Sequence, residues 1–160
     1  MDDFRGSLKH LKAKIDEAQI VDISSIKVGD IIYVPLDEDD GLTLTNGYNT
    51  RNKYIVIIGF TPEGIALGAL LINSDINPAK RSPEMMNCQY PMLMRHYPSI
   101  LRYDSWLDCS DIFELSKEKI SERKGKLKGC LTTEDKDRIL DFLRETDLFD
   151  NVTKRRFGLL

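Results

Sequence analysis

Four basic residues border two polar stretches of the chain, where basic side chains are well placed to hold phosphate. Arg51 and Lys53 end a polar stretch that begins with four acidic residues at 37–40, and Lys80 and Arg81 lie in the next one. The chain is net acidic, with 23 Lys and Arg against 26 Asp and Glu, so a polyanion is attracted only where cations gather. We expect any nucleic-acid contact to centre on the edge at 51–54 together with 74–81, unless Arg51 and Lys53 pair with the acids of their own stretch.

Other polar side chains offer candidates for a site at the ends of strand-like segments. Asn73 and Ser74 end an apolar segment, where they either line a site or cap a turn through their own backbone. His96 has the side chain best suited to proton transfer near neutral pH, although a lone histidine is more often a plain hydrogen-bonding residue. His10 lies on the exposed side of a predicted helix.

The segment at 100–107 is predicted as a strand that carries a charged pair and the single tryptophan. Arg102 and Asp104 would share one face because side chains alternate along a strand, and Trp106 has the same parity. On this interpretation Arg102 lines a groove that binds RNA and Trp106 stacks a base. The alternative is a cross-strand ion pair beside a core tryptophan.

A β-hairpin is the clearest element, and it would bring the polar stretches together. Segments 54–60 and 65–72 are apolar at nearly every position and flank a Thr-Pro-Glu-Gly turn at 61–64. Proline and glycine occupy the positions that a tight reversal uses. The pattern predicts two central strands buried on both faces, with Gly59 and Gly68 where the sheet bends.

Further strands are predicted before and after the hairpin. One covers 31–34 and is expected to end at Pro35, and others lie near 89–94, 100–107 and 111–115. Strands that are followed by one closing helix favour an antiparallel, mainly β fold of the α+β kind. The barrel is expected at 26–116 within a single domain of 160 residues.

Helices are predicted at both ends of the chain. Apolar residues at spacings of three and four predict an amphipathic helix at 4–19, with Leu11 on its buried stripe. Thr132, with an acidic residue three positions later, predicts the start of a helix at 132–146. The basic residues Lys154, Arg155 and Arg156 of the tail at 150–160 are expected to be solvated, unless they contact nucleic acid or a partner.

The composition indicates a cytoplasmic protein. The three cysteines are odd in number and lack the spacing of a zinc site, so we expect reduced, partly buried thiols. The charged first residues do not form a signal peptide, and the apolar runs are shorter than the roughly 20 residues that span a bilayer. No metal, cofactor or membrane association is expected.

Two stretches resemble the MazF/PemK family of plasmid-maintenance toxins. The first is VGDIIYV at 28–34, followed by the polar stretch that ends at Arg51. The second runs through 104–115 to Gly-Lys-Leu at 125–127 and the helix after Thr132. The resemblance implies an SH3-like antiparallel β-barrel, usually a homodimer, that cleaves single-stranded RNA without a metal and is silenced by an antitoxin protein.

The resemblance also implies roles for individual residues. Arg51 and Lys53 stand where the family has a phosphate-binding arginine, and Asn73 and Ser74 stand where it has a Thr-Ser pair. In such cleavage an RNA 2′-hydroxyl attacks the neighbouring phosphate, so the site needs a base, fixed cations and a proton source.

The sequence departs from the family pattern at three points, which leaves two functions open. No proline follows Arg51, an amide at Asn73 cannot replace a hydroxyl in proton transfer, and Asp108 and Ser110 stand where some members have an arginine and an aspartate. The chain is therefore expected to be either an endoribonuclease or a non-catalytic module that binds a peptide or protein on the same barrel.

Overall fold

The structure is a computed structural model, which describes residues 9, 11, 14, 19–37, 50–74 and 82–160. Its strands are β1 (Asp30–Leu36), β2 (Arg51–Phe60), β3 (Ala66–Asn73), β4 (Gln89–Met92), β5 (Ser105–Asp108), β6 (Phe113–Ser116) and β7 (Lys126–Cys130). Its helices are the 3-10 turns η1 (Ile23–Ser25) and η4 (Met94–His96) and the α-helices α2 (Pro83–Met86), α3 (Lys117–Glu122), α4 (Thr133–Glu145) and α5 (Asn151–Arg156). Most of the helix predicted at 4–19 lies outside the described residues. Leu11, which is described, is exposed rather than buried.

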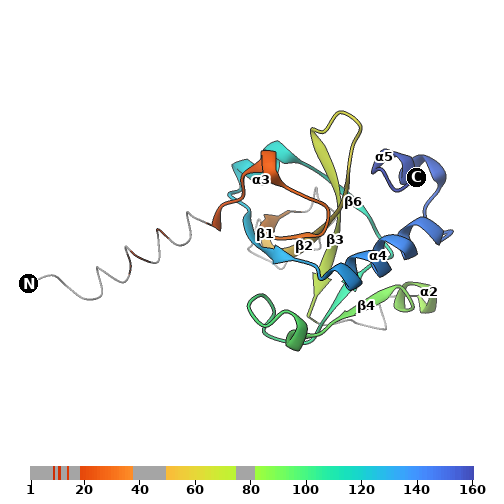
Figure 1. Ribbon diagram of the computed structural model, residues 1–160, viewed down its shortest axis with the longest axis horizontal. Helices are drawn as coiled ribbons and strands as arrows, with labels where there is room; N and C mark the ends of the chain where they lie inside the picture. The colour runs from red at the N-terminus through yellow and green to blue at the C-terminus, as the bar shows by residue number, and fades with distance from the viewer. Residues whose placement is uncertain (1–8, 10, 12–13, 15–18, 38–49, 75–81) are drawn as a thin grey trace, which may run out of the picture.

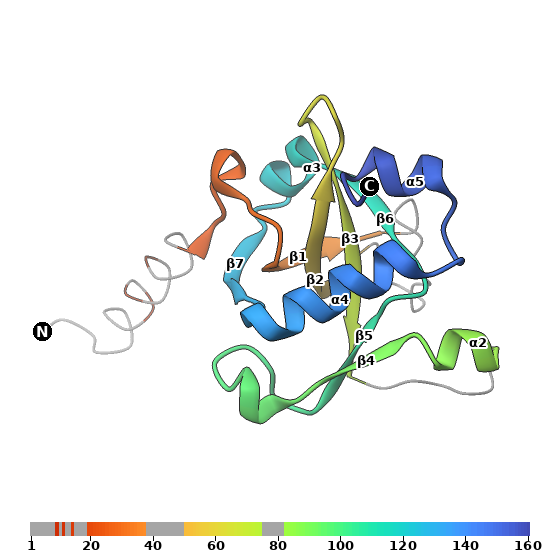
Figure 2. The ribbon, with the colours of Figure 1, turned by 45° about the vertical axis from the view of Figure 1, so that its right-hand side comes forward.

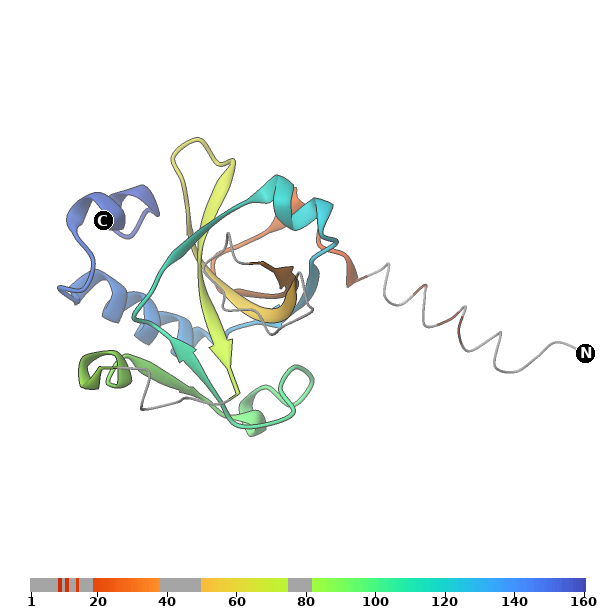
Figure 3. The same ribbon diagram turned by 180° about the vertical axis from the view of Figure 1, so that it is seen from behind.

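The strands form one antiparallel sheet that curls into half a barrel (Figure 1). Within the described ranges the order is β4-β5-β3-β2-β1-β7. Strand β6 pairs with the same edge of β3 as β5, but at the beginning of β3 rather than at its end. From behind, the bent β1 and β2 lie beside the long β3 (Figure 3). All the pairings are antiparallel, which confirms the predicted antiparallel, mainly β character.

The hairpin strands are apolar from Tyr54 onward in β2 and as far as Ile72 in β3, where both faces of the sheet are buried. Successive side chains of a strand point to opposite faces, so Ile57 and Ile58 join two different apolar clusters. The cluster around Ile57 includes Ile120 of α3, and the cluster around Ile58 includes Ile139 of α4. Each face therefore has its own cover, as the apolar pattern predicts.

Helix α4 is the predicted C-terminal helix, and it crosses one face of the sheet (Figure 2). Thr132 is the N-cap, and its hydroxyl accepts a hydrogen bond from the backbone N–H of Asp135 at 3.2 Å. Ile139 and Leu143, one turn apart, are buried in the cluster between helix and sheet. Local capping and a buried stripe thus both favour the helix that the sequence predicts.

Asp135, in the first turn of α4, ties this helix to the segment that follows β4. Its carboxylate oxygens accept hydrogen bonds from the hydroxyl groups of Tyr90 and Tyr97, each at 2.5 Å. The Tyr97 oxygen accepts from the N–H of Thr132 at 3.1 Å, which satisfies an amide at the start of the helix. Burial first, and the hydrogen bond to Asp135 second, raise the pKa of both phenols, that of Tyr90 to about 12. The network joins α4, β4 and the turn at Tyr97.

The basic tail folds back on the protein, so the prediction of a solvated cluster is wrong for Lys154. This residue of α5 is buried. Its ammonium donates to the backbone carbonyls of Arg144 and Thr146, at 2.8 and 2.6 Å. Carbonyls at the C-terminal end of a helix have no partner within the helix, and here they replace the water around the lysine.

The two hairpin glycines lie where Phe157 packs directly on the sheet. The register of β2 and β3 shifts between Ile57 and Gly59, which confirms an irregularity where a bend is predicted. A Cβ at Gly59 would lie 1.9 Å from the carbonyl oxygen of Phe157, and one at Gly68 would lie 2.8 Å from its ring. Only glycine permits so close an approach.

Strand β1 continues past Pro35, where the sequence predicts its end. Pro35 opposes Asn52 of β2, and its carbonyl accepts a hydrogen bond from Arg123 at 2.9 Å. The N and C=O of a strand residue point to the same side, so the missing N–H of Pro35 faces away from β2. No pairing with β7 extends beyond Tyr33, and proline is tolerated where a strand has no neighbour on that side.

Three further predictions need correction. The strand predicted at 100–107 begins only at Ser105, because the N–H groups at 100 and 101 bond to the Tyr97 carbonyl and form a turn. The basic stretch at 117–128, for which the sequence predicts no element, contains α3 and the start of β7. All three cysteines are free, as expected, but Cys130 is exposed rather than partly buried.

We expect Asp135→Asn to lower the free energy of unfolding by about 2 kcal/mol, because a hydrogen bond to a charged group contributes about 1.5–3 kcal/mol. Urea denaturation measures the change. Glu134→Gln is the matched control, since Glu134 makes an exposed ion pair with Arg138, of a kind worth about 0.3–0.5 kcal/mol. Equal losses in the two variants would show that Asp135 does not anchor the helix.

We expect Gly68→Ala to cost about 1–3 kcal/mol of stability through overpacking, and to cost much less in a Phe157→Ala background, where the opposing ring is gone. Gly59→Ala should stay costly in both backgrounds, because its close contact is with the backbone carbonyl of Phe157. Urea denaturation of the two double-mutant cycles measures these terms. A cost at Gly68 that does not depend on the ring contradicts the packing described above.

Candidate nucleic-acid interface

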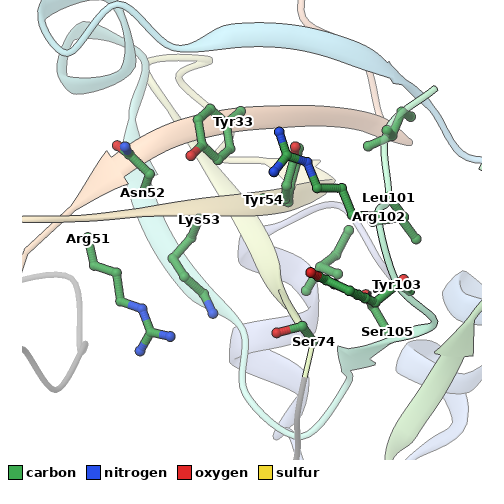
Figure 4. Close-up of a pocket in the computed structure, with 12 residues that line it drawn as sticks. Tyr33, Arg51, Asn52, Lys53, Tyr54, Ser74, Leu101, Arg102, Tyr103 and Ser105 are labelled. Carbon is green, nitrogen blue, oxygen red and sulfur yellow. Dashed lines mark hydrogen bonds between the residues drawn. The ribbon is translucent and has the colours of Figure 1, made fainter. Parts of the chain in front are cut away.

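A pocket of about 360 Å³ lies at the end of the sheet where β2 begins and β3 ends (Figure 4). The segment at 100–105 forms its third side. The lining contains three cations, three tyrosines, two serines, an amide and three aliphatic residues, namely Arg51, Lys53, Arg102, Tyr33, Tyr54, Tyr103, Ser74, Ser105, Asn52, Ile72, Ile100 and Leu101. The pocket therefore joins basic and aromatic groups from three parts of the chain.

The cations of β2 come from the strand end that extends beyond the apolar clusters. Tyr54 pairs with Ile72 across the hairpin, so Lys53 lies opposite Asn73 and shares its face. The Lys53 ammonium donates to the Asn73 side-chain oxygen at 2.8 Å. Arg51, two residues earlier, is exposed on the same face. Figure 4 shows both cations on one side of β2. The hairpin register thus sets the spacing of the two cations that the sequence singles out.

Two tyrosines, on the neighbouring strands β1 and β2, line the pocket from the other face of the sheet. Tyr33 of β1 and Tyr54 of β2 are cross-strand neighbours. Their ring centroids are 4.7 Å apart, with the planes tilted by 43°. Cross-strand aromatic pairs of this kind stabilise a sheet, and both rings remain partly exposed. The pair forms the aromatic part of the pocket lining on the face of the sheet opposite Arg51 and Lys53.

Arg102 and Tyr103 reach the pocket from the turn that follows Tyr97. The predicted strand pair of Arg102 with Asp104 is not formed, because Asp104 instead accepts a hydrogen bond from the N–H of Met94 at 2.9 Å. The Ser105 hydroxyl donates to the carbonyl of Tyr103 at 2.9 Å. Both bonds hold the chain on the C-terminal side of Tyr103, a residue that is 68% exposed.

The pocket is electropositive in a chain that is acidic overall. No aspartate, glutamate or histidine is present among the described residues that line it. Within the described part of the chain, Arg51 and Arg102 form no ion pair with a carboxylate. The pKa of Tyr54 is raised mainly by burial and then by the Tyr33 phenol, while the positive charge of Arg102 opposes the rise. Among the described residues, the charges of Arg51 and Arg102 are thus available to an anion.

The other described residues that were predicted for the site lie outside the pocket lining. Asn73 does not line the pocket and instead holds Lys53. Trp106 on β5 is 37% exposed outside the lining. His96 is exposed in η4 and is likewise outside the lining. Lys80, Arg81 and His10 lie outside the described residues.

Tyr54 falls at the end of the edge predicted at 51–54, but Tyr33, Tyr103 and Ser105 were missed because their positions depend on pairing between distant segments. One signal could have placed the two strand tyrosines. Tyr33 and Tyr54 each occur in a short β-like run, where the alternation of side chains along a strand assigns them to a face of the sheet. No comparable pattern marks Tyr103, which lies in a turn. Within the described residues no three His, Cys, Asp or Glu side chains cluster as a metal site, and no described helix is long and apolar enough to cross a membrane.

No protein-family model and no curated protein sequence matches this chain. What the structure defines is a class of protein, a curled antiparallel half-barrel covered by helices, with a basic and aromatic pocket at one end of its sheet.

We expect Arg102→Gln to raise the pKa of Tyr54 further, because removal of a nearby positive charge disfavours the phenolate. NMR titration of ring-labelled tyrosine, with Tyr54 assigned through Tyr54→Phe, measures the shift. Arg95→Gln is the control, since this exposed arginine does not line the pocket. If the two substitutions move the Tyr54 titration equally, Arg102 does not face the tyrosine pair.

Proposed function

We propose that this chain binds single-stranded RNA in the pocket between β2, β3 and the 100–105 segment, as a divergent relative of the MazF/PemK toxins. The observation that carries the proposal is the gathering of Arg51, Lys53 and Arg102 around one 360 Å³ pocket whose described lining contains no acidic residue. In a chain of net charge −3, such a cluster is where a polyanion finds favourable potential.

The chain order of the elements supports the family part of the proposal. The Gly-Asp pair at 29–30 enters β1, the polar stretch then leads into β2 at Arg51, and α4 follows the last strand. We propose on this basis that the half-barrel is an SH3-like barrel. The same proposal includes a cytoplasmic location, a protein antitoxin as inhibitor and a homodimer, whose mass light scattering would report.

The chemistry that we propose is cleavage by the RNA itself, assisted by the pocket. The 2′-oxygen loses its proton and attacks the adjacent phosphorus, the bond from phosphorus to the 5′-oxygen breaks, and the 5′-oxygen takes up a proton. The products are a 2′,3′-cyclic phosphate and a 5′-hydroxyl. Arg51 and Lys53 would stabilise the charge of the pentavalent phosphate, with Ser74 donating a hydrogen bond and Asn73 positioning Lys53.

Binding without cleavage is the second candidate, and one observation favours it. The described lining of the pocket holds no histidine or carboxylate, the groups that most often act as general base. A basic, aromatic pocket without a base also suits a non-catalytic module that binds an acidic peptide. Product analysis decides between cleavage and binding, and competition by an acidic peptide tests the module.

We expect the double substitution Arg51→Ala and Lys53→Ala to weaken binding of a 2′-O-methyl RNA oligomer, which cannot be cleaved by its own 2′-oxygen. Each lost phosphate contact should lower the slope of log affinity against log salt by about 0.7. Fluorescence anisotropy across a salt series measures the slope, and unmodified RNA, analysed for cyclic phosphate ends, measures cleavage.

The matched control is the double substitution Lys27→Ala and Arg155→Ala, which removes the same charge from exposed positions outside the pocket. Its salt slope should stay near the wild-type value, and the melting temperatures of both variants should change little. Wild-type protein that binds no RNA oligomer at low salt would refute the proposed function. Equal loss of binding in both double variants would refute the proposed site.

A further inference from the structure

Tyr103 is the most exposed of the large aromatic residues in the described part of the chain, at 68%. Its ring is exposed although hydrogen bonds hold the chain on its C-terminal side. The Tyr103 carbonyl accepts from the Ser105 hydroxyl at 2.9 Å, and the next side chain, that of Asp104, accepts from the Met94 N–H at 2.9 Å. The chain on its C-terminal side is therefore fixed while the ring is held out of the core, an arrangement that burial of apolar surface does not explain.

The surroundings of this ring are those of a nucleic-acid site. Tyr103 lines the same pocket as Arg51 and Lys53. Figure 4 shows it extending from the 100–105 segment on the side of Ser74, across from the two β2 cations. Proteins that bind single-stranded nucleic acid combine cations for the backbone with aromatic rings on which bases stack.

The other aromatic residues fit this role less well. Tyr33 and Tyr54 are packed against each other at 4.7 Å and are only partly exposed, so each has one face already covered. Trp106, the residue that sequence parity suggests, is outside the pocket lining. Among the described aromatic residues of the pocket, Tyr103 has the most ring surface open to a base.

We infer that Tyr103 is a base-stacking platform, on which one unpaired nucleobase lies while Arg51 and Lys53 hold a neighbouring phosphate. The inference rests on the proposed function and names its substrate class, an RNA strand with an unpaired, accessible base beside the bound phosphate. Stacking tolerates any base because every base has a π face, so the platform selects single-stranded over paired RNA without requiring one sequence.

The test uses the full chain and two probes of equal length, a 2′-O-methyl oligouridylate and the corresponding abasic oligomer with the same phosphates. Uridines stack little on one another, so loss of ring stacking is not masked by the probe. Tyr103→Leu removes the ring, Tyr103→Phe keeps it, and Trp106→Leu removes an aromatic ring outside the pocket. Thermal melting checks that each variant is folded.

We expect Tyr103→Leu to weaken oligouridylate binding by about 5- to 150-fold, the range found for loss of one stacked base. Tyr103→Phe and Trp106→Leu should bind like wild type. The abasic probe should bind wild type more weakly and should not distinguish Tyr103→Leu from it. The salt slope should be unchanged in every variant, because stacking releases no counterions.

Two results would overturn the inference while leaving the proposed function intact. One is salt-dependent RNA binding that is equally tight in wild type and Tyr103→Leu. The other is an equal loss on the abasic and base-containing probes, which would give Tyr103 a role other than stacking. If wild-type protein binds neither probe at low salt, the proposed function fails, and the base platform fails with it.

Discussion

The two hydrogen bonds that the Asp135 carboxylate accepts are the interactions on which the pocket most depends. The donors are the hydroxyl groups of Tyr90 and Tyr97, and the chain turns at Tyr97 into the segment that carries Arg102 and Tyr103. One wall of the pocket is therefore held by a helix that begins some thirty residues later in the sequence. A half-buried network of this kind positions a surface loop because leaving a member unpaired is costly.

The two ends of the β2–β3 hairpin differ in packing: the turn end is tightly packed, and the open end is exposed. At the turn end, Gly59 and Gly68 admit Phe157 so closely that no side chain fits between them. Lys154 fixes that C-terminal segment through the free carbonyls of α4. At the open end the strands extend beyond the apolar clusters. Arg51 is exposed there, and Lys53 and Asn73 are partly exposed. Tight packing at one end supports an exposed polar site at the other.

Much of the fold was predictable because its signals are local. The hairpin follows from two apolar runs around a turn, and α4 follows from Thr132 and an apolar stripe. Arg51, Lys53 and Ser74 were also predicted for the site and line one pocket. The strand at 100–107 was placed too early because hydrogen bonds to the Tyr97 carbonyl form a turn there, and no residue pattern within that segment marks it.

The sequence by itself determined the sheet class, the hairpin, the C-terminal helix and the cations at the strand end, since alternation, turn chemistry and capping act between near neighbours. Only the tertiary structure decided that Tyr33 would pair with Tyr54, that Tyr103 would be held out beside Lys53, and that Lys154 would be buried. Each of these depends on contacts between distant segments, whose partners are chosen by how the two faces of the sheet are covered.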